Sequence, residues 1–426
     1  MVGVERNADS AESARAALSH HTAGGSVVEA DFFGFDWPAL LTQLPDPLLV
    51  VGNPPWVTKA ALSSLESTNV PEKSNARRHT GLDALTGKSN FDISEWMLLR
   101  LLGWLNGRHA TLAMLCKTTV ARKVLASAWK DDLSLGGARM YRLNAMSHFG
   151  AAVDACLLVV RFTPASLGRD CEVRDLDAPD GATITTFGYR DGTLVANTAH
   201  HERWKHLAGT SRRRWRSGIK HDCGAVMELR EEHGRLENGL GDVVEIEPAF
   251  LYPMLKTSEV AASPTPRPSR WMLVPQTSIG EDTAAIRERA PLTWAYLTKH
   301  AAALDRRGSS IYRGRPPFSI FGVGDYSFAP WKVVISGFYK RLDFRVVGPH
   351  RDKPVVLDDL SYFLACDSRQ DAETLAALLN SEPARQFYEA FVFWDAKRPV
   401  TIEVLSRLDL DALAAATLST AVRRSR

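Results

Sequence analysis

The chain has 426 residues, of which 45% are hydrophobic and 24% are charged, and its formal net charge is +3. This length allows two or three domains with cores of their own, and the composition is ordinary for a globular protein. No apolar run reaches membrane-spanning length and we identify no signal peptide, so we expect no membrane partner. The five cysteines lack metal-binding or disulfide spacing, so we expect a protein of the reducing cytoplasm without a metal site.

The first predicted element is a short strand that ends in an acid, Glu5, and an alanine-rich helical stretch follows to Leu18. Folds that bind dinucleotides or adenosyl cofactors use an acid at a strand end to accept hydrogen bonds from ribose hydroxyls. For an isolated glutamate, a surface role is the simple alternative. A second predicted strand, 26–29, leads to Asp31 and Phe32, and here the alternative is a turn or a helix cap.

The third predicted element is the aliphatic run 48–51, which is typical of a buried parallel strand and is ended by Gly52. Open α/β sheets bind their ligands at the carboxyl ends of such strands. Beyond this end, Asn53 and the carbonyl group of Pro54 can accept hydrogen bonds from an exocyclic amine, and Trp56 can stack on its ring. The alternative is a strand-ending turn with a buried tryptophan.

The next stretch, 57–90, has the composition of a polar loop. We then expect an amphipathic helix over 90–105, whose start at Asp92 has the alternative reading of a helix N-cap. A strand over 110–115 follows, and a further helix starts near Val120. Residues 143–162 are predicted to form a hairpin that contains Phe149, for which a core aromatic is the alternative.

Asn53-Pro54-Pro55-Trp56 resembles the catalytic motif of amino-directed DNA methyltransferases of the N6-adenine branch, which is usually Asn-Pro-Pro-Tyr. Other segments resemble further motifs of this family in the same order along the chain. The resemblance implies an α/β fold, with a Rossmann-like S-adenosylmethionine-dependent methyltransferase sheet and an α+β target-recognition domain.

The resemblance also implies roles for individual residues. Asn53, Pro54, Pro55 and Trp56 would form the catalytic loop, and Phe149 would stack on the extruded base opposite Trp56. The residues implied to contact S-adenosylmethionine are Glu5 at the ribose, Asp31 and Phe32 at the adenine, and Asn53 and Asp92 between the cofactor and base pockets.

One family feature is not found. In the family, a glycine-rich loop after a preceding, central strand cradles the cofactor, and this sequence begins after that point. The resemblance therefore implies that the first strand of the sheet is missing. An upstream segment or a partner chain would supply it, or the chain would be a defective remnant.

The second half of the chain suggests recognition of nucleic acid. The boundaries that we expect are 1–165 for the partial catalytic domain, 166–210 for a β-rich connector and 211–426 for a DNA target-recognition domain. Gly218-Ile219-Lys220 and residues 252–259 resemble segments of the family's recognition half. A glycine between Arg216 and Lys220 would let the backbone approach a phosphate. The candidate DNA contacts are Arg216, Lys220, Lys332, Lys340, Lys397 and Arg398. The alternatives are solvated faces, surface salt bridges and a sheet core with a basic rim.

The predicted function is methyl transfer from S-adenosylmethionine to the N6 amine of adenine at a specific site in double-stranded DNA, in a restriction-modification or phage-defence system. The base would have to be flipped out, because its amine is unreachable inside a duplex. Cytosine amine is a lesser candidate. Enzymes that methylate glutamine side chains or RNA bases carry related motifs but lack so large a recognition half. A non-catalytic DNA-binding remnant or a subunit of a split methyltransferase is the remaining alternative.

Overall fold

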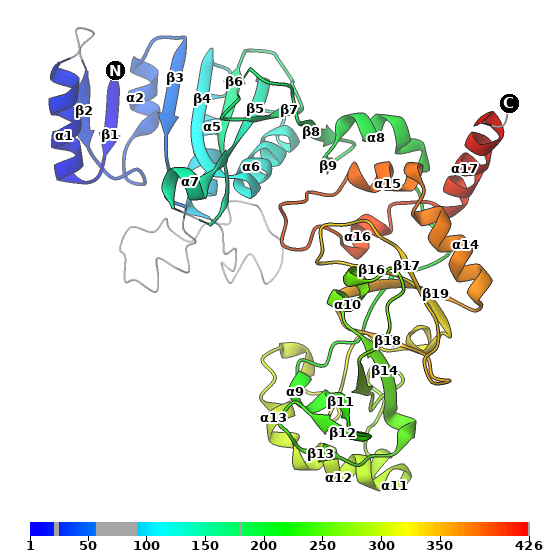
Figure 1. Ribbon diagram of the computed structural model, residues 1–426. Helices are drawn as coiled ribbons and strands as arrows, with labels where there is room; N and C mark the ends of the chain where they lie inside the picture. The colour runs from blue at the N-terminus through cyan, green and yellow to red at the C-terminus, as the bar shows by residue number, and fades with distance from the viewer. Residues whose placement is uncertain (21–24, 57–91, 151, 179, 425–426) are drawn as a thin grey trace. The chain divides into compact units, whose positions relative to one another are not determined.

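The computed structural model describes residues 1–20, 25–56, 92–150, 152–178 and 180–424. It divides into two compact units, Met1–Leu194 and Val195–Arg426, which are treated separately below (Figure 1). The segment expected to be a polar loop, 57–90, lies outside the described residues. Within the described part of the chain, no helix combines the length and the apolarity that a membrane span requires.

The N-terminal unit begins with a small parallel sheet. β1 (Val2–Glu5) pairs with β2 (Ser26–Glu29), and α1 (Ala8–Ser19) connects the two strands. The helix starts where the sequence favours it, because the Asn7 side chain accepts a hydrogen bond from the backbone N–H of Ser10. The predicted strand, helix and strand are thus present, and the acid Glu5 ends the first strand.

A sheet of seven strands forms the rest of this unit, in the order β3-β4-β6-β5-β7-β8-β9. β3 is parallel to β4, whereas β6 lies antiparallel between β4 and β5. The predicted hairpin 143–162 contains β6, but its other strand, β5, begins earlier, at Leu135. The strands are β3 (Leu48–Gly52), β4 (Ala110–Lys117), β5 (Leu135–Asn144), β6 (Asp154–Phe162), β7 (Asp170–Asp175), β8 (Thr185–Arg190) and β9 (Thr193–Val195). The helices are α2 (Trp37–Gln43), α5 (Ile93–Leu105), α6 (Thr118–Lys130) and α7 (Ala145–Phe149).

The predicted buried strand 48–51 is instead an edge strand. Among the described strands β3 pairs only with β4, and the side chains of Leu49 and Val51 are 64% and 67% exposed. The prediction of burial was wrong because an aliphatic run looks the same in a central strand and in an edge strand.

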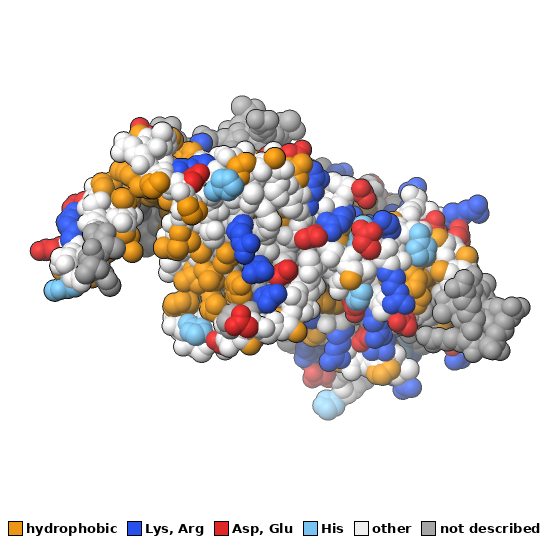
Figure 2. Space-filling model, turned by 90° about the horizontal axis from the view of Figure 1, so that it is seen from above, with side chains coloured by type: hydrophobic (Ala, Val, Ile, Leu, Met, Phe, Trp, Pro, Cys, Tyr) orange, Lys and Arg blue, Asp and Glu red, His pale blue; other side chains and the backbone are white. Residues whose placement is uncertain are grey.

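Figure 2 shows hydrophobic side chains gathered over the N-terminal unit, whereas basic and acidic side chains intermingle over the C-terminal unit.

The segment expected to be a separate connector extends this sheet. β7 pairs parallel with β5, and β8 pairs antiparallel with β7. Asp191 and Gly192 both have positive φ angles, 48° and 77°, which suits the tight turn between β8 and β9. Residues up to Leu194 therefore belong to the N-terminal unit.

The C-terminal unit contains two further sheets. One has the order β13-β12-β11-β15-β14-β18 and the other β10-β19-β16-β17. The first consists of β11 (Glu228–Glu232), β12 (Arg235–Asn238), β13 (Val243–Val244), β14 (Leu251–Leu255), β15 (Arg270–Leu273) and β18 (Val356–Leu357). The second consists of β10 (Arg216–Ser217), β16 (Trp331–Ser336), β17 (Arg345–Val347) and β19 (Ser361–Cys366).

This unit also contains helices, several of which pack against these sheets. They are α8 (Thr198–Trp204), α9 (Gly224–Met227), α10 (Thr257–Ala262), α11 (Ile286–Arg289), α12 (Pro291–Lys299), α13 (Ala301–Asp305), α14 (Arg369–Leu379), α15 (Glu382–Glu389), α16 (Ile402–Leu405) and α17 (Leu410–Arg424). One apolar core joins β16 and β19 to α14 and α15, and a second joins β11, β14 and β15 to α12. This unit is therefore a mixed α/β structure with more than one core.

Candidate functional site

The Asn53-Pro54-Pro55-Trp56 loop lies at the carboxyl end of β3. Gly52 pairs with Met114, so the loop leaves the sheet beside the carboxyl end of the parallel strand β4. Pro54 is buried, Trp56 is half-buried, and Asn53 is exposed. The prolines limit the backbone freedom of the loop, while the amide group of Asn53 remains accessible to a ligand.

Lys117 connects this loop to the start of helix α5. Its ammonium Nζ lies 2.8 Å from the carbonyl oxygen of Trp56 and 2.6 Å from Oδ2 of Asp92. The indole Nε1 of Trp56 also donates to the carbonyl oxygen of Leu115, at 3.4 Å. The ends of β3 and β4 and the first turn of α5 are thus joined by one lysine and one tryptophan.

This role of Lys117 was not predicted from the sequence. Its only signal was a lysine at the predicted end of a strand, and its two partners are 61 and 25 residues away in the chain. Such a contact cannot be read from local spacing. Lys117 does not touch the amide of Asn53, so its role would be to position the loop.

The predicted pair of base-stacking aromatics is brought together. The ring centroids of Trp56 and Phe149 are 5.9 Å apart and the ring planes stand at 89°, an edge-to-face contact. Phe149 ends the short helix α7 and is 52% exposed. In this arrangement the rings contact each other, so a flat base would enter between them only after one ring turned.

Two predicted cofactor ligands lie at the same end of the β1–β2 pair. The Oε1 of Glu5 accepts a hydrogen bond from the backbone N–H of Asn7, and Oδ1 of Asp31 accepts one from Phe33. The guanidinium of Arg6 lies 3.5 Å from Oδ2 of Asp31. Both carboxylates are only half-buried, so they remain within reach of a ligand.

Phe32 and Asp92 are already engaged inside the protein. The Phe32 ring packs against Trp37 at 4.8 Å and against Trp104 at 6.1 Å between centroids. Asp92 is 7% exposed, and its carboxylate accepts from the Ser94 hydroxyl and from Lys117. It also caps α5 by accepting from the backbone N–H of Ser94, the alternative that the sequence left open.

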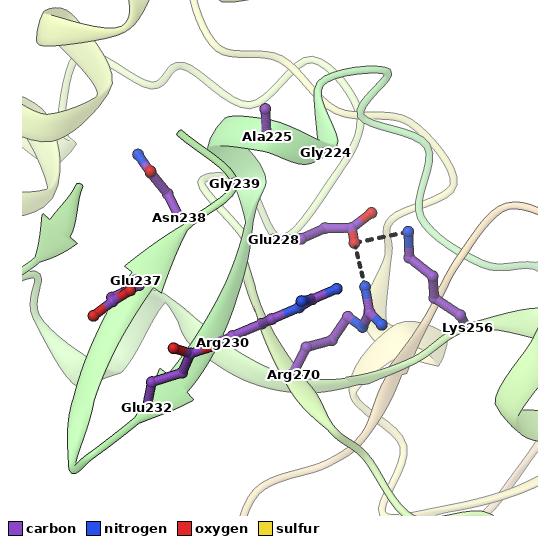
Figure 3. Close-up of a pocket in the computed structure, with 10 residues that line it drawn as sticks. All are labelled: Gly224, Ala225, Glu228, Arg230, Glu232, Glu237, Asn238, Gly239, Lys256 and Arg270. Carbon is purple, nitrogen blue, oxygen red and sulfur yellow. Dashed lines mark hydrogen bonds and ion pairs between the residues drawn. The ribbon is translucent and has the colours of Figure 1, made fainter. Parts of the chain in front are cut away.

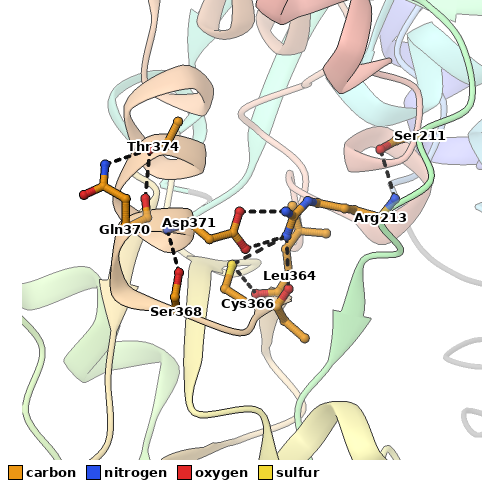
Figure 4. Close-up of polar contacts among 9 residues, drawn as sticks. Ser211, Arg213, Leu364, Cys366, Ser368, Gln370, Asp371 and Thr374 are labelled. Atoms are coloured by element: carbon orange, nitrogen blue, oxygen red, sulfur yellow. Dashed lines mark hydrogen bonds and ion pairs between the residues drawn. The ribbon is translucent and has the colours of Figure 1, made fainter.

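The predicted DNA contacts of the C-terminal unit differ in their surroundings. Arg216 lies over the Tyr326 ring at 4.4 Å, and Lys220 forms a 2.7 Å ion pair with Asp222. Lys340, Lys397 and Arg398 are exposed. In the basic cluster 212–216, Arg213 binds Asp371 through two hydrogen bonds of 3.0 and 2.7 Å, at the first turn of α14 (Figure 4). Its guanidinium is therefore occupied within the fold.

Lys332 requires a correction. It lies in the central strand β16, is 1% exposed, and donates to the carbonyl oxygen of Ala329 at 2.6 Å. Burial lowers the pKa of Lys332 to about 7. Because its ammonium is enclosed by the protein, Lys332 cannot serve as a phosphate contact on the surface.

Gly218 also has a different role from the one expected. The sequence suggested that a glycine between Arg216 and Lys220 lets the backbone approach a phosphate. In the structure, a Cβ at this position would overlap the carbonyl oxygens of Leu357 and Asp358. Gly218 is therefore needed for the close approach of two protein segments.

A comparison with known protein families finds no matching family model. The Type II methyltransferase M.NspV of Nostoc sp. (strain ATCC 29411 / PCC 7524) is 45% identical to this chain over 385 residues, which cover 90% of this chain and 80% of that protein.

Two solved structures resemble the chain at low identity. MmeI, a Type IIL restriction-modification enzyme solved in complex with DNA, has a TM-score of 0.51 at 14% identity over 89% of this chain. BpuSI, a type IIG restriction endonuclease, has a TM-score of 0.32 at 14% identity, which is too low to carry an argument. The chain spans 48% of each of these longer proteins. The likeness to MmeI concerns the fold alone.

The identity to M.NspV extends over most of both chains. Identity of this size and extent is shared by proteins of common descent. This chain belongs to the family of Type II methyltransferases.

Proposed function

We propose that this chain transfers a methyl group from S-adenosylmethionine to the N6 amine of an adenine flipped out of double-stranded DNA. The transfer would occur at a specific sequence, in a restriction-modification or phage-defence system. Membership of the Type II methyltransferases supports DNA methylation in general. The observation that carries the choice of an amine is the Asn53-Pro54-Pro55-Trp56 loop at the end of β3, with the Phe149 ring beside Trp56.

In this proposal the loop positions the amine. The side-chain oxygen of Asn53 and the carbonyl oxygen of Pro54 accept hydrogen bonds from the two hydrogens of the amine, which raises the electron density on its nitrogen. Trp56 and Phe149 hold the base from its two faces, after one ring has turned from the present edge-to-face contact. Most of the rate enhancement would come from positioning and from the exclusion of water.

The residues present fit an adenosyl cofactor in part. Glu5 and Asp31 are half-buried carboxylates at the ends of neighbouring parallel strands, which suits hydrogen bonds from ribose hydroxyls and from an adenine amine. S-adenosylmethionine supplies an electrophilic methyl group when bound. We assign Asp92 a positioning role, since both of its oxygens are engaged by Ser94 and Lys117. We place Phe32 beside the cofactor ring, as the wall formed with Trp37 and Trp104.

We further propose that the N-terminal unit is a Rossmann-like methyltransferase domain and that residues 211–426 recognise the DNA target. Arg216, Lys220, Lys340, Lys397 and Arg398 are the phosphate contacts in this proposal, without the buried Lys332. Support comes from their exposed or half-buried side chains. MmeI, which shares the fold, was solved with DNA bound.

The test is transfer of a radiolabelled methyl group from S-adenosylmethionine to duplex DNA, single-stranded RNA or a glutamine-containing protein extract. We expect label in duplex DNA only. Asn53→Ala should lower the transfer rate at least about 100-fold, the loss typical when one donor or acceptor at a reacting atom is removed. DNA affinity of this variant should remain within about twofold of the wild type, because Asn53 makes no phosphate contact in this proposal.

Thr417→Ala is a suitable control, because Thr417 lies in α17 of the other unit and its hydroxyl donates to the carbonyl oxygen of Leu413 in the same helix. It should leave the transfer rate unchanged. Label in RNA or protein alone would contradict the proposed substrate. DNA binding without transfer would favour the non-catalytic subunit.

A further inference from the structure

A charged pocket lies on one face of the six-stranded sheet in the C-terminal unit. It has a volume of about 510 Å³ and is formed around β11, β12 and β15 (Figure 3). Its lining includes three carboxylates, Glu228, Glu232 and Glu237, and three cations, Arg230, Lys256 and Arg270. Most pockets for small metabolites are lined mainly by apolar side chains, which this one is not.

Glu228 holds two of the three cations in place. Its Oε2 lies 2.8 Å from Nζ of Lys256 and 3.0 Å from a guanidinium nitrogen of Arg270. His221 approaches the other oxygen, with Nε2 at 3.5 Å from Oε1. Burial alone would raise the pKa of Glu228, but His221 and Lys256 hold it at about 2, so the carboxylate is ionised at neutral pH.

Arg230 is the cation that remains available. It lies two residues after Glu228 on β11, so its side chain projects from the same face of the sheet. Arg230 is exposed and forms no ion pair within the part of the chain that the structure describes. Figure 3 shows its guanidinium pointing into the pocket, toward Glu228 and Arg270.

The charge balance of the pocket disfavours a phosphate as the partner of Arg230. Glu237 lies directly opposite Arg230 on β12, and Glu232 follows it by two residues on the same face of β11. Both carboxylates would repel a phosphate. The major-groove edge of a G·C pair is neutral and offers the acceptors O6 and N7 of guanine beside the N4 donor of cytosine. A planar guanidinium bordered by carboxylates matches this pattern of acceptors and donor.

We propose that Arg230 reads a guanine of a G·C pair in the DNA target, with two hydrogen bonds from its guanidinium to O6 and N7. Glu228 is a positioning residue, because it keeps Lys256 and Arg270 paired and leaves Arg230 as the base-reading group. This inference rests on the proposed function, since it requires the chain to bind a specific DNA sequence.

The test is selection of bound duplexes from a randomised DNA pool by the full chain, followed by affinity measurements on the selected sequence. We expect the wild type to select a motif that contains at least one fixed G·C pair. Arg230→Ala should relax the preference at that single pair and weaken binding of the selected sequence about 10- to 100-fold. Affinity for unrelated DNA should change little.

Arg230→Lys distinguishes base reading from phosphate binding. Lysine keeps the positive charge but loses the two parallel donors, so a base-reading role predicts that this variant also loses the preference. Arg287→Ala is the matched control, because Arg287 is an exposed arginine of the same unit outside the pocket. It should retain both the motif and the affinity.

Three results would overturn the inference. The first is a motif without a fixed G·C pair, and the second is an unchanged motif in Arg230→Ala. The third is a uniform loss of affinity that Arg230→Lys restores, which would make Arg230 a phosphate contact. In all three the wild type still selects a sequence, so the proposed function stands. If the wild type selects no sequence and binds no DNA, the proposed function fails as well.

Discussion

The side chain of Lys117 joins two segments that lie far apart in the sequence, the Asn53-Pro54-Pro55-Trp56 loop and the start of α5. Its two hydrogen-bond partners, the Trp56 carbonyl and the Asp92 carboxylate, both lie within 2.8 Å. The Asp92 carboxylate also accepts hydrogen bonds from Ser94, and Asp92 is 7% exposed. Loss of Lys117 would leave this carboxylate buried without its cation, which is costly.

Lys117→Met should therefore lower the free energy of unfolding by about 3 kcal/mol and also lower the methyl-transfer rate. Adding Asp92→Asn should restore much of the stability, because the uncompensated charge is removed. It should not restore the rate, because the Trp56 carbonyl still lacks its donor. Chemical denaturation and methyl-transfer assays on both variants measure these effects.

Lys130→Met is the control, since Lys130 is exposed in the last turn of α6. It should change neither quantity. If the double variant regained both stability and methyl-transfer rate, Lys117 would act through charge balance alone. This result would contradict a role of Lys117 in positioning the loop.

At this scale the sequence indicated a candidate loop, 53–56, but not the contacts that hold it in place. The resemblance to a catalytic motif led to the expectation that Trp56 and Phe149 act together, and the structure places their rings 5.9 Å apart. Lys117 was missed because neither of its partners is local. Lys332 was misjudged because a lysine among aromatic and basic residues looks like a surface contact. Its place within the apolar run of β16 was the signal against this.

The strand β16 carries Lys332 in a buried position, which has a consequence for stability. The pKa of Lys332 is about 7 in the folded chain against 10.5 as its ordinary value. The folded state thus binds fewer protons than the unfolded state between pH 7 and 10.5. The contribution of Lys332 to the free energy of unfolding therefore becomes more favourable as the pH rises through that window. Below pH 7, the full cost of burying the charged ammonium applies.

Lys332→Met should raise the free energy of unfolding by about 1–4 kcal/mol at pH 6, with a smaller gain at pH 9. DNA affinity should stay unchanged, because the ammonium does not reach the surface. Denaturation at the two pH values and a DNA-binding measurement provide the check. Lys340→Met, a change at an exposed lysine of the same unit, should show no pH-dependent gain. A loss of DNA affinity in Lys332→Met but not in a stability-matched variant would reinstate Lys332 as a contact.

Gly218 directly follows β10, and its backbone packs against the turn that precedes β19. The backbone N–H of Gly218 donates to the Ser361 carbonyl, and the carbonyls of Leu357 and Asp358 leave no room for a Cβ. Gly218→Ala should therefore lower the free energy of unfolding by about 3 kcal/mol or more. Thermal unfolding measures this effect. Gly308→Ala is the control, because no atom lies within 4 Å of its added Cβ. Equal melting temperatures of the two variants would contradict this packing.

The elements themselves followed from the sequence where local pattern decides them. Asp92 begins α5 as a cap, one of the two alternatives for this residue, and the expected antiparallel strand is present as β6. The edge position of β3 agrees with the missing central strand that the resemblance implied before it. The pairing of β7 with β5 was not predictable, because it joins strands that are distant in sequence.

For the whole molecule, we propose that the N-terminal unit transfers the methyl group and that the C-terminal unit reads DNA. The family is established by the identity to M.NspV over 90% of the chain. The chemistry of the target base is the central proposal. It rests on the Asn53 loop, and it predicts a single modified nucleoside.

The most direct measurement is mass spectrometry of nucleosides from duplex DNA that has been incubated with the chain and S-adenosylmethionine. We expect N6-methyl-2′-deoxyadenosine, and at least about 100-fold slower formation of it when Asn53→Ala replaces the wild type. Formation of N4-methylcytosine instead would show that the target is the amine of cytosine and that the assignment to adenine is wrong. No methylated nucleoside, with DNA nevertheless bound, would contradict the catalytic role of this chain.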